Sequence, residues 1–445
     1  MKVTFVLPAI GKKPGERYIG TWKMEPLTIA VLKALTPADV ETELFDDRIE
    51  LIDFDTATDL VAIPVETYTA RRSYDIAARF RARGVPVVLG GYHTTLLPAE
   101  AAEHADAIVT GNAEAVWVGL LADAKAGRLC ARYDGGTTPT GGDLRPDRSI
   151  LAGKRYLPVG LVETGRGCGY SCEFCAIAGY YGANYHPRSV DAVIADVEAS
   201  SHKTFFFVDD NLVADREHVR ELCRRLKPLG VLWAAQGTLT MANDPTLLAE
   251  MKAAGCELIL IGFESLEPVS LAAMGKRWSS ALGERATLVK RIHDAGIGIY
   301  ATFVMGYEGD TRDTFARTLD FARESAFFTA AFNHLLPFPG TRLYRRLEKE
   351  GRLLSPNWWL DADYNYGQLA YRPANFEPEE VSGLCLRARQ EFGTPVMMGK
   401  RGLAALQRGR LKMWPIFWAM NARIGSEVDE KFNVPLGQNL DELPK

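Results

Sequence analysis

The chain has 445 residues, of which 47% are hydrophobic and 24% are charged, and this is the composition of a folded globular protein. Its formal net charge is −4, so no overall basic field is present to attract nucleic acid. No run of 18 apolar residues appears, and the first residues resemble a β-strand more than a signal peptide, so we expect a cytoplasmic protein without a transmembrane segment. Seven cysteines, three of them within eight residues, favour a thiolate site over a disulfide framework.

The first 125 residues or so alternate short apolar runs with helical stretches. This pattern predicts an α/β domain with a doubly wound parallel sheet of flavodoxin-like order and a ligand crevice beyond the carboxyl ends of its strands. Turns at those ends contain Gly90, Gly91, His93 and Gly111, and glycine there would let a bulky ligand approach the backbone. The predicted strands are 3–7, 40–45, 60–65, 85–89 and 107–109, and the predicted helices are 26–35, 71–83, 98–104 and 115–124.

A stretch poor in apolar residues and rich in turn formers begins at Asp134 and predicts a linker. After it the alternation of strands and helices resumes in longer units, with helix N-caps expected at Ser189 and Asp244. Six such units predict a partial (βα)6 TIM-like barrel, in which chemistry lies on the loops after the strands. The predicted strands are 159–163, 205–208, 231–235, 258–263, 297–304 and 330–335, and later helices are expected at 378–392 and 402–422. The predicted divisions are 1–133, 134–150 as the linker, 151–350, and a mainly helical region at 351–445.

Three cysteines follow the first predicted barrel strand in a C-x3-C-x2-C run: Cys168, Cys172 and Cys175. Closely spaced thiolates let one loop hold an iron–sulfur cluster. Three ligands for four irons leave one iron open, as a catalytic metal site requires. Phe174 is a candidate to shield such a cluster from water.

Zinc is the alternative ligand of this loop. A structural zinc site needs four closed ligands, and the nearby fourth candidate is His186. A second C-x2-C pair is absent from the sequence, so the pattern favours iron and sulfide.

The cysteine run resembles the cluster motif of the radical S-adenosylmethionine (SAM) superfamily, including the aromatic residue before the third cysteine. Further matches follow later strands, at 207–211, 262–265, 306–311 and 337–344. Together with the N-terminal domain they resemble the cobalamin-binding-domain radical SAM enzyme family.

The resemblance implies a cytoplasmic transferase that is metal-binding and uses a 4Fe-4S cluster, SAM and cobalamin. The open iron would chelate SAM, and one electron, supplied by a donor such as flavodoxin or ferredoxin, would release a 5′-deoxyadenosyl radical. The implied function is methylation of an unactivated carbon in a small-molecule, lipid or tetrapyrrole substrate. A cyclase, oxidase or rearrangement enzyme of the same build, and a non-catalytic cobalamin or metal sensor, are the alternatives.

The resemblance also implies site residues. Cys168, Cys172 and Cys175 would bind the cluster. The candidate SAM-binding and cobalamin-binding residues are Phe174, Arg188, Asp209, Asp210, Asn211, Glu264, Ser265, Gly306, Gly90, Gly91, His93 and Gly111. Helix capping is the alternative for 209–211, a tight turn for Gly306 and a solvated side chain for Arg188.

The N-terminal domain lacks the D-x-H-x-x-G motif of cobalamin-dependent mutases, so we do not expect His93 to bind cobalt. Trp358, Trp359, Tyr364 and Tyr366 form an aromatic group after the barrel. They either cap a substrate pocket or bury area against the barrel.

Overall fold

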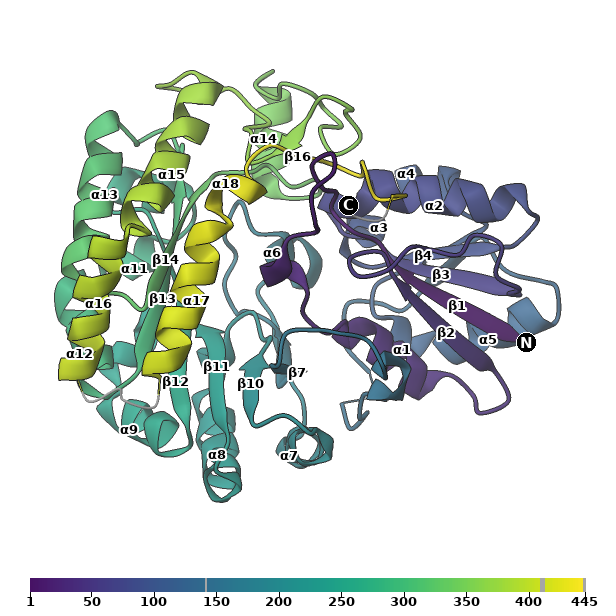
Figure 1. The fold of residues 1–445 in the computed structure, drawn as a ribbon, viewed down its shortest axis with the longest axis horizontal. Coiled ribbons are helices and arrows are strands. Elements are labelled where there is room, and N and C mark those ends of the chain that lie inside the picture. The colour runs from purple at the N-terminus through teal and green to yellow at the C-terminus, as the bar shows by residue number, and fades with distance from the viewer. Residues whose placement is uncertain (141, 409–412, 443–445) are drawn as a thin grey trace.

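The computed structural model describes residues 1–140, 142–408 and 413–442. Two α/β units lie side by side, and helices of the last hundred residues pack against the second unit (Figure 1). In the described ranges no helix is both long and apolar enough to span a bilayer.

The N-terminal unit is a parallel sheet with strand order β2-β1-β3-β4-β5-β6. The five predicted strands are confirmed, and the order is flavodoxin-like as expected. The sixth strand was missed because it is short and ends where the turn-rich stretch that predicts a linker begins. The strands are β1 Lys2–Leu7, β2 Glu41–Asp46, β3 Leu60–Pro64, β4 Val87–Gly90, β5 Ala107–Thr110 and β6 Arg132–Asp134. The helices are α1 Leu27–Leu35, α2 Ala70–Ala82, α3 Tyr92–Leu96, α4 Pro98–Glu103 and α5 Trp117–Lys125.

The second unit is a parallel sheet whose strands follow chain order, β7-β10-β11-β12-β13-β14. All six predicted strands are present, which confirms the partial barrel. Helices cover its outer face (Figure 1), and a large apolar core fills the space between them and the sheet. The strands are β7 Gly160–Val162, β10 Thr204–Phe207, β11 Leu232–Gly237, β12 Cys256–Glu264, β13 Gly298–Met305 and β14 Thr329–His334.

Helix starts in the barrel follow local side-chain chemistry. Ser189 accepts a hydrogen bond from the Ala192 amide and Asp244 accepts one from Leu247, so both predicted N-caps are confirmed. The helices are α6 Ala176–Tyr181, α7 Val190–Ala199, α8 Arg216–Leu226, α9 Pro245–Ala253, α10 Pro268–Ala273, α11 Arg277–Ser280, α12 Arg285–Asp294, α13 Arg312–Glu324 and α14 Arg342–Lys349. Short 3₁₀ turns occur at Gly20–Trp22, Thr67–Thr69, Ala113–Ala115, Arg148–Leu151, Leu212–Ala214, Lys227–Leu229 and Leu239–Asn243.

The C-terminal region is mainly helical. The predicted helix 378–392 is confirmed as α15, whereas the stretch 402–422 belongs to two helices, α16 and α17, and its residues 409–412 lie outside the described residues. The helices are α15 Pro378–Phe392, α16 Pro395–Gln407, α17 Trp414–Ser426 and α18 Val428–Lys431. Two small pairs of strands are also present, β8 Gly165–Gly167 with β9 Tyr185–Pro187, and β15 Asn365–Tyr366 with β16 Val434–Pro435.

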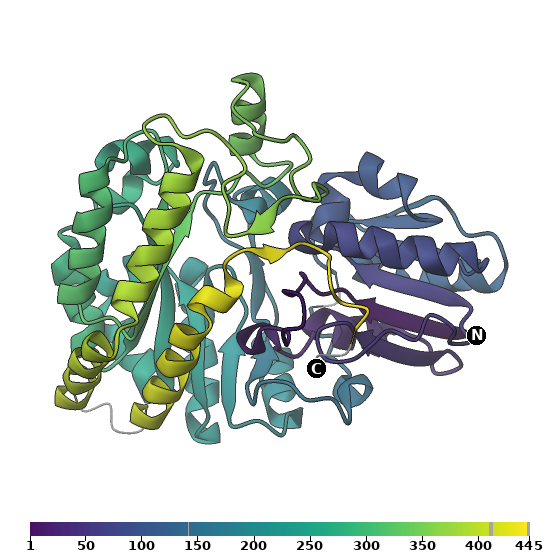
Figure 2. The ribbon, with the colours of Figure 1, turned by 45° about the horizontal axis from the view of Figure 1, so that its top comes forward.

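The end of the chain returns to the N-terminal unit (Figure 2). The Gly437 amide donates to the Ile10 carbonyl over 2.6 Å, and Asp441 pairs with Arg72 at 2.9 Å. Trp358 and Trp359 are fully buried in a core cluster with N-terminal residues such as Ile63. The predicted aromatic group therefore buries area between the two units, which the sequence pattern alone did not indicate.

Candidate functional site

The residues from Cys168 to Cys175, which we call the cysteine loop, follow β8 and lead into α6, and β9 comes after that helix. Gly167 has φ +86°, and a Cβ on it would lie 2.1 Å from the Asn184 carbonyl oxygen. The Cys168 amide donates to the same carbonyl over 3.1 Å. Glycine at 167 is therefore required for the hairpin to turn into the loop.

The three thiols of the cysteine loop are free, with Cys172 buried and the other two partly exposed. Burial raises the pKa of Cys168 to about 11 and that of Cys172 to about 12, while the Lys276 ammonium acts in the opposite direction on each. The charge of Cys175 also raises the pKa of both thiols. Binding to a metal must therefore displace protons from these groups.

Residues 209–211 follow β10 and hold the start of the cysteine loop. Asp209 accepts from the Thr164 amide at 3.1 Å and from the Thr164 hydroxyl at 2.7 Å. Asp210 accepts from the Gly167 amide at 3.0 Å, and Asn211 donates to the Cys168 carbonyl over 3.1 Å. None of the three side chains caps a helix in the described structure, so the capping alternative is not what they do.

The carboxylates after β10 lie in a poorly solvated place. Burial raises the pKa of Asp209 to about 7 and that of Asp210 to about 6, although their hydrogen bonds to the hairpin lower both values. The carboxylates are therefore stabilised by hairpin donors, and any ligand that meets them encounters groups close to their titration range.

Glu264 ends β12 next to the cysteine loop. It has φ +61°, a strained conformation for a non-glycine residue, and its carboxylate accepts from the Lys276 ammonium over 2.6 Å. Burial alone would lower the pKa of Lys276, but Glu264 and the cysteine thiols outweigh it and raise the pKa. A buried ion pair thus stands beside the three thiols, and Lys276 had no motif that would have marked it in the sequence.

The loop before Lys276 and the helix α14 clamp the cysteine loop from its other side. The Glu173 amide donates to the Met274 carbonyl over 3.0 Å, and the Glu173 carboxylate pairs with Arg346 at 2.8 Å. Arg342 donates to the carbonyl and hydroxyl of Ser171. Together with residues 209–211, these two segments fix the conformation of the loop that carries the thiols, although all three are distant from one another in sequence.

Ser265 and Gly306 both donate to the carboxylate of Asp310, which lies in the stretch 306–311. Asp310 is buried and accepts from the Gly306 amide at 2.8 Å, from Tyr307 at 3.1 Å and from the Ser265 hydroxyl at 3.4 Å. A Cβ at Gly306, which has φ +107°, would lie 2.7 Å from the Tyr371 hydroxyl. This supports the tight-turn alternative for Gly306.

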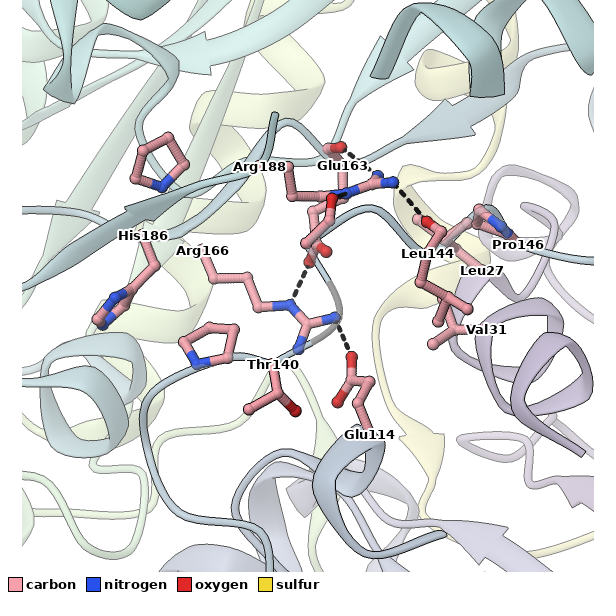
Figure 3. Close-up of a pocket in the computed structure, with 13 residues that line it drawn as sticks. Leu27, Val31, Glu114, Thr140, Leu144, Pro146, Glu163, Arg166, His186 and Arg188 are labelled. Atoms are coloured by element: carbon pink, nitrogen blue, oxygen red, sulfur yellow. Dashed lines mark hydrogen bonds and ion pairs between the residues drawn. The ribbon is translucent and has the colours of Figure 1, made fainter. Parts of the chain in front are cut away.

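Arg188 lies in a small pocket between the linker and the β8–β9 hairpin, away from the thiols (Figure 3). Its guanidinium donates to the carbonyls of Glu163 and Leu144 at 2.7 and 2.6 Å. In the same pocket Arg166 pairs with Glu114 of the N-terminal unit at 2.6 Å and with Glu163 at 2.8 Å. Arg188 thus fastens the linker, and Arg166, which the sequence did not indicate, joins the two units.

The glycine turns of the N-terminal unit face the barrel, but they serve contacts within the unit. A Cβ on Gly91 would lie 2.8 Å from the Val65 carbonyl, and one on Gly111 would lie 2.3 Å from the Gly136 carbonyl. Gly90, by contrast, has ordinary space around it. Neighbouring backbone thus accounts for glycine at Gly91 and Gly111, and their approach to a ligand stays a prediction.

His93 is fully buried, and both its ring nitrogens have partners. Nδ1 lies 3.2 Å from the Thr67 hydroxyl and Nε2 lies 2.9 Å from Glu100. Glu100 also accepts from Trp359 at 3.0 Å. In this structure His93 links the N-terminal unit to the buried aromatic group through Glu100.

The N-terminal unit contacts α6, the helix that follows the cysteine loop. The Tyr92 ring lies 5.0 Å from that of Tyr180 in α6, and burial together with the charge of Asp210 raises the pKa of Tyr92. Burial also raises the pKa of Glu66, which follows β3. Tyr92 therefore marks where the strand ends of the N-terminal unit meet the segment that carries the thiols.

A cavity of about 290 Å³ opens beside the cysteine loop. It is lined by Phe174 from that loop, by Tyr68 from the N-terminal unit, and by His334 at the end of β14. Burial lowers the pKa of His334 to about 4, so the imidazole is neutral at physiological pH. The position of Phe174, between the loop and this cavity, fits a shielding role.

The family model for the radical SAM superfamily matches residues 162–322, which contain the cysteine loop. A relative from Chlorobaculum tepidum, bacteriochlorophyllide d C-8(2)-methyltransferase, is 28% identical over 374 residues, which are 79% of this chain and 82% of the relative. Residues 162–322 are therefore a radical SAM domain. The chain is a radical SAM enzyme, and members of that superfamily use a 4Fe-4S cluster and SAM.

Two solved structures share the architecture of this radical SAM enzyme. The cobalamin-dependent SAM radical enzyme OxsB matches with a TM-score of 0.67 and 14% identity over 99% of this chain and 77% of its own. The radical SAM methyltransferase TsrM from Kitasatospora setae matches with a TM-score of 0.64 and 19% identity over 78% and 76% of the two chains. The chain therefore shares the fold of these two enzymes.

The donor set of this radical SAM enzyme fits a 4Fe-4S cluster. Its three thiols are free and stand on one loop that neighbouring segments hold in place, with the Lys276 ammonium beside them. Three thiolates on one short loop can each bind a different iron and leave the fourth iron open. In the described ranges, no group of three or more His, Cys, Asp or Glu side chains is arranged to hold one metal ion.

Proposed function

We propose that this enzyme is a cobalamin-dependent radical SAM methyltransferase that acts on an unactivated carbon of a small-molecule, lipid or tetrapyrrole substrate. The observation that carries the proposal is the contact between the N-terminal unit and the segment that carries the thiols, where the Tyr92 ring lies 5.0 Å from Tyr180 in α6. The methyltransferase relative, which aligns with 79% of this chain, supports the same reaction class.

The residues have distinct parts in this proposal. Cys168, Cys172 and Cys175 bind the cluster, and Glu264 with Lys276 binds the charged end of SAM. When bound, the cluster and SAM supply one-electron bond cleavage and cobalamin supplies methyl transfer. Phe174 and the cavity beside it exclude water from the reacting carbon.

The N-terminal unit provides the proposed binding surface for cobalamin. Gly90 and the accessible residues Glu66 and Tyr92 are the proposed contacts, whereas His93 is not needed because its nitrogens are occupied. His93→Ala should therefore keep most of the bound cobalamin, although it should lower the thermal stability. A His93→Ala protein that folds but loses cobalamin would contradict this assignment.

Anaerobic reconstitution with SAM, cobalamin and a one-electron donor such as flavodoxin tests the reaction class. With substrate, the formation of both 5′-deoxyadenosine and S-adenosylhomocysteine is expected, because methyl transfer uses SAM in two ways. 5′-Deoxyadenosine alone, with or without cobalamin, would favour the second candidate, a cyclase, oxidase or rearrangement enzyme. A reconstituted protein that never binds cobalamin would also move the assignment there.

A further inference from the structure

A second cavity, of about 200 Å³, continues the first one into the barrel. The two cavities share Asn333, Tyr366 and Arg389 as lining residues. The first reaches the cysteine loop at Phe174, and the second extends beneath α17 and α18. Arg389 on α15 therefore stands between two adjoining cavities, one of which reaches the cysteine loop.

Arg389 is a half-buried guanidinium without an acidic partner. Its Nε donates to the Phe332 carbonyl and one Nη to the Asn333 amide oxygen, each over 2.8 Å. Within the described residues no Asp or Glu oxygen lies within 4 Å of it, in contrast to Arg166, which has two such partners. Arginine has five N–H donors, so several remain for a ligand.

Other cations line the second cavity. Arg401 is 2% exposed and has no acidic partner among the described residues; it donates to the Phe328 carbonyl and the Asn421 amide oxygen. Its guanidinium also lies 4.0 Å from the centre of the Phe392 ring. Burial lowers the pKa of Arg401 to about 10, so it stays charged at neutral pH. Lys431 lines the same cavity, paired with Glu427 at 3.2 Å.

The balance of charge in this enclosed space is positive, with three cationic side chains and one nearby carboxylate. The remaining ionisable groups around Arg389 are Tyr68, Tyr300, Tyr366, His334 and Cys385, and each is neutral at physiological pH because burial shifts its pKa away from ionisation. A buried positive charge without a counter-ion is costly, and an anionic ligand would offset that cost.

We infer that Arg389 binds a carboxylate of the substrate, and that the aromatic body of the substrate occupies the first cavity beside Tyr68 and Phe338. Aromatic side chains, among them Tyr68, Phe174 and Phe338, line the first cavity and suit an aromatic ligand. The planar fork of a guanidinium matches the two oxygens of a carboxylate. This inference rests on the proposed function only in taking the cavity as the substrate site.

A matched pair of probes tests the inference without catalysis. Calorimetric titration of the anaerobically reconstituted enzyme compares 1-naphthylacetate with its uncharged amide. The acid should bind about 10- to 150-fold more tightly, the range expected for hydrogen bonds to a charged group. R389Q should abolish that preference and R389K should keep part of it. Arg387 is an exposed arginine on the same helix, and the control variant R387Q should keep the full preference for the acid.

Several outcomes would overturn the inference. Equal affinity for acid and amide, or an unchanged preference in R389Q, would remove Arg389 as the anion partner. Displacement of the acid by inorganic phosphate at lower concentration than by acetate would overturn the carboxylate assignment. Substrate-free cleavage of SAM to 5′-deoxyadenosine is measured in the parent enzyme and in the control R387Q, so a failure of the radical chemistry itself is read separately from a failure of this inference.

Discussion

The two parallel sheets of this enzyme use their carboxyl ends differently. In the N-terminal sheet the turns after the strands contact one another through backbone, as Gly91 does with Val65. In the barrel sheet the residues after β10 carry carboxylates and an amide, and these bind Thr164, Gly167 and Cys168, at and just before the start of the cysteine loop. The first arrangement joins turns within one unit, whereas the second holds the segment that leads into the loop. Both positions follow from parallel topology, but their side chains decide what each edge does.

The largest expected effect concerns the thiols of the barrel edge. Replacing any one of Cys168, Cys172 or Cys175 by Ala should abolish SAM cleavage and most bound iron and sulfide, because no other cysteine lies on the clamped loop. Cobalamin binding by the N-terminal edge should persist. Iron, sulfide and 5′-deoxyadenosine are measured, with the exposed Cys130→Ala as control. Stoichiometric zinc without sulfide in the parent protein would refute the cluster.

Glu264→Ala should weaken SAM binding by about 10- to 150-fold, the equivalent of one hydrogen bond to a charged group. It also leaves Lys276 as an uncompensated buried charge, which should lower the free energy of unfolding by about 3–5 kcal/mol. The double variant Glu264→Ala/Lys276→Met should recover much of the stability but not the SAM affinity. SAM titration and chemical denaturation separate the two effects. An unchanged SAM dissociation constant in Glu264→Ala would show that this pair is structural.

Asp209→Ala tests whether the barrel edge acts by holding the loop. The change removes the acceptor of two Thr164 donors and should lower the free energy of unfolding by about 1–3 kcal/mol. The cluster should be lost faster on exposure to a chelator, while substrate-free SAM binding changes little. The exposed Asp191→Ala offers a comparison on a nearby helix. Equal chelation rates in Asp209→Ala and the parent would contradict the anchoring role.

His334 provides the smallest effect and a pH dependence. Its folded pKa of about 4 lies below the ordinary value of 6.5, so the folded state binds fewer protons between these values and stability falls as the pH falls. From pH 8 to 5.5 this contribution is about 1.4 kcal/mol. Over that interval the free energy of unfolding of His334→Gln should fall by about 1.4 kcal/mol less than that of the parent. Denaturation at both pH values measures it, and identical pH slopes would mean that the imidazole is solvated.

Local sequence patterns predicted most of the fold because parallel strands are short apolar runs and the helices between them have clear caps. Ser189 and Asp244 illustrate this, since each cap depends on residues three positions apart. The short strands β6, β8 and β9 were missed because three residues rich in glycine or polar side chains have no periodicity to read. Lys276 was missed for another reason, since its partner Glu264 is twelve residues away and no motif joins them.

The sequence by itself identified the cysteine loop, predicted the two parallel sheets and indicated the resemblance to radical SAM enzymes. It could do so because a cluster motif and strand–helix alternation are local and chemically specific. Only the tertiary structure decided what the remaining site residues do. It assigned 209–211 to the loop, Arg188 to the linker and His93 to a buried network, and it brought Arg389 to the junction of two cavities. The physical reason is that a side chain's role depends on which partners burial leaves within reach, and those partners come from distant parts of the chain.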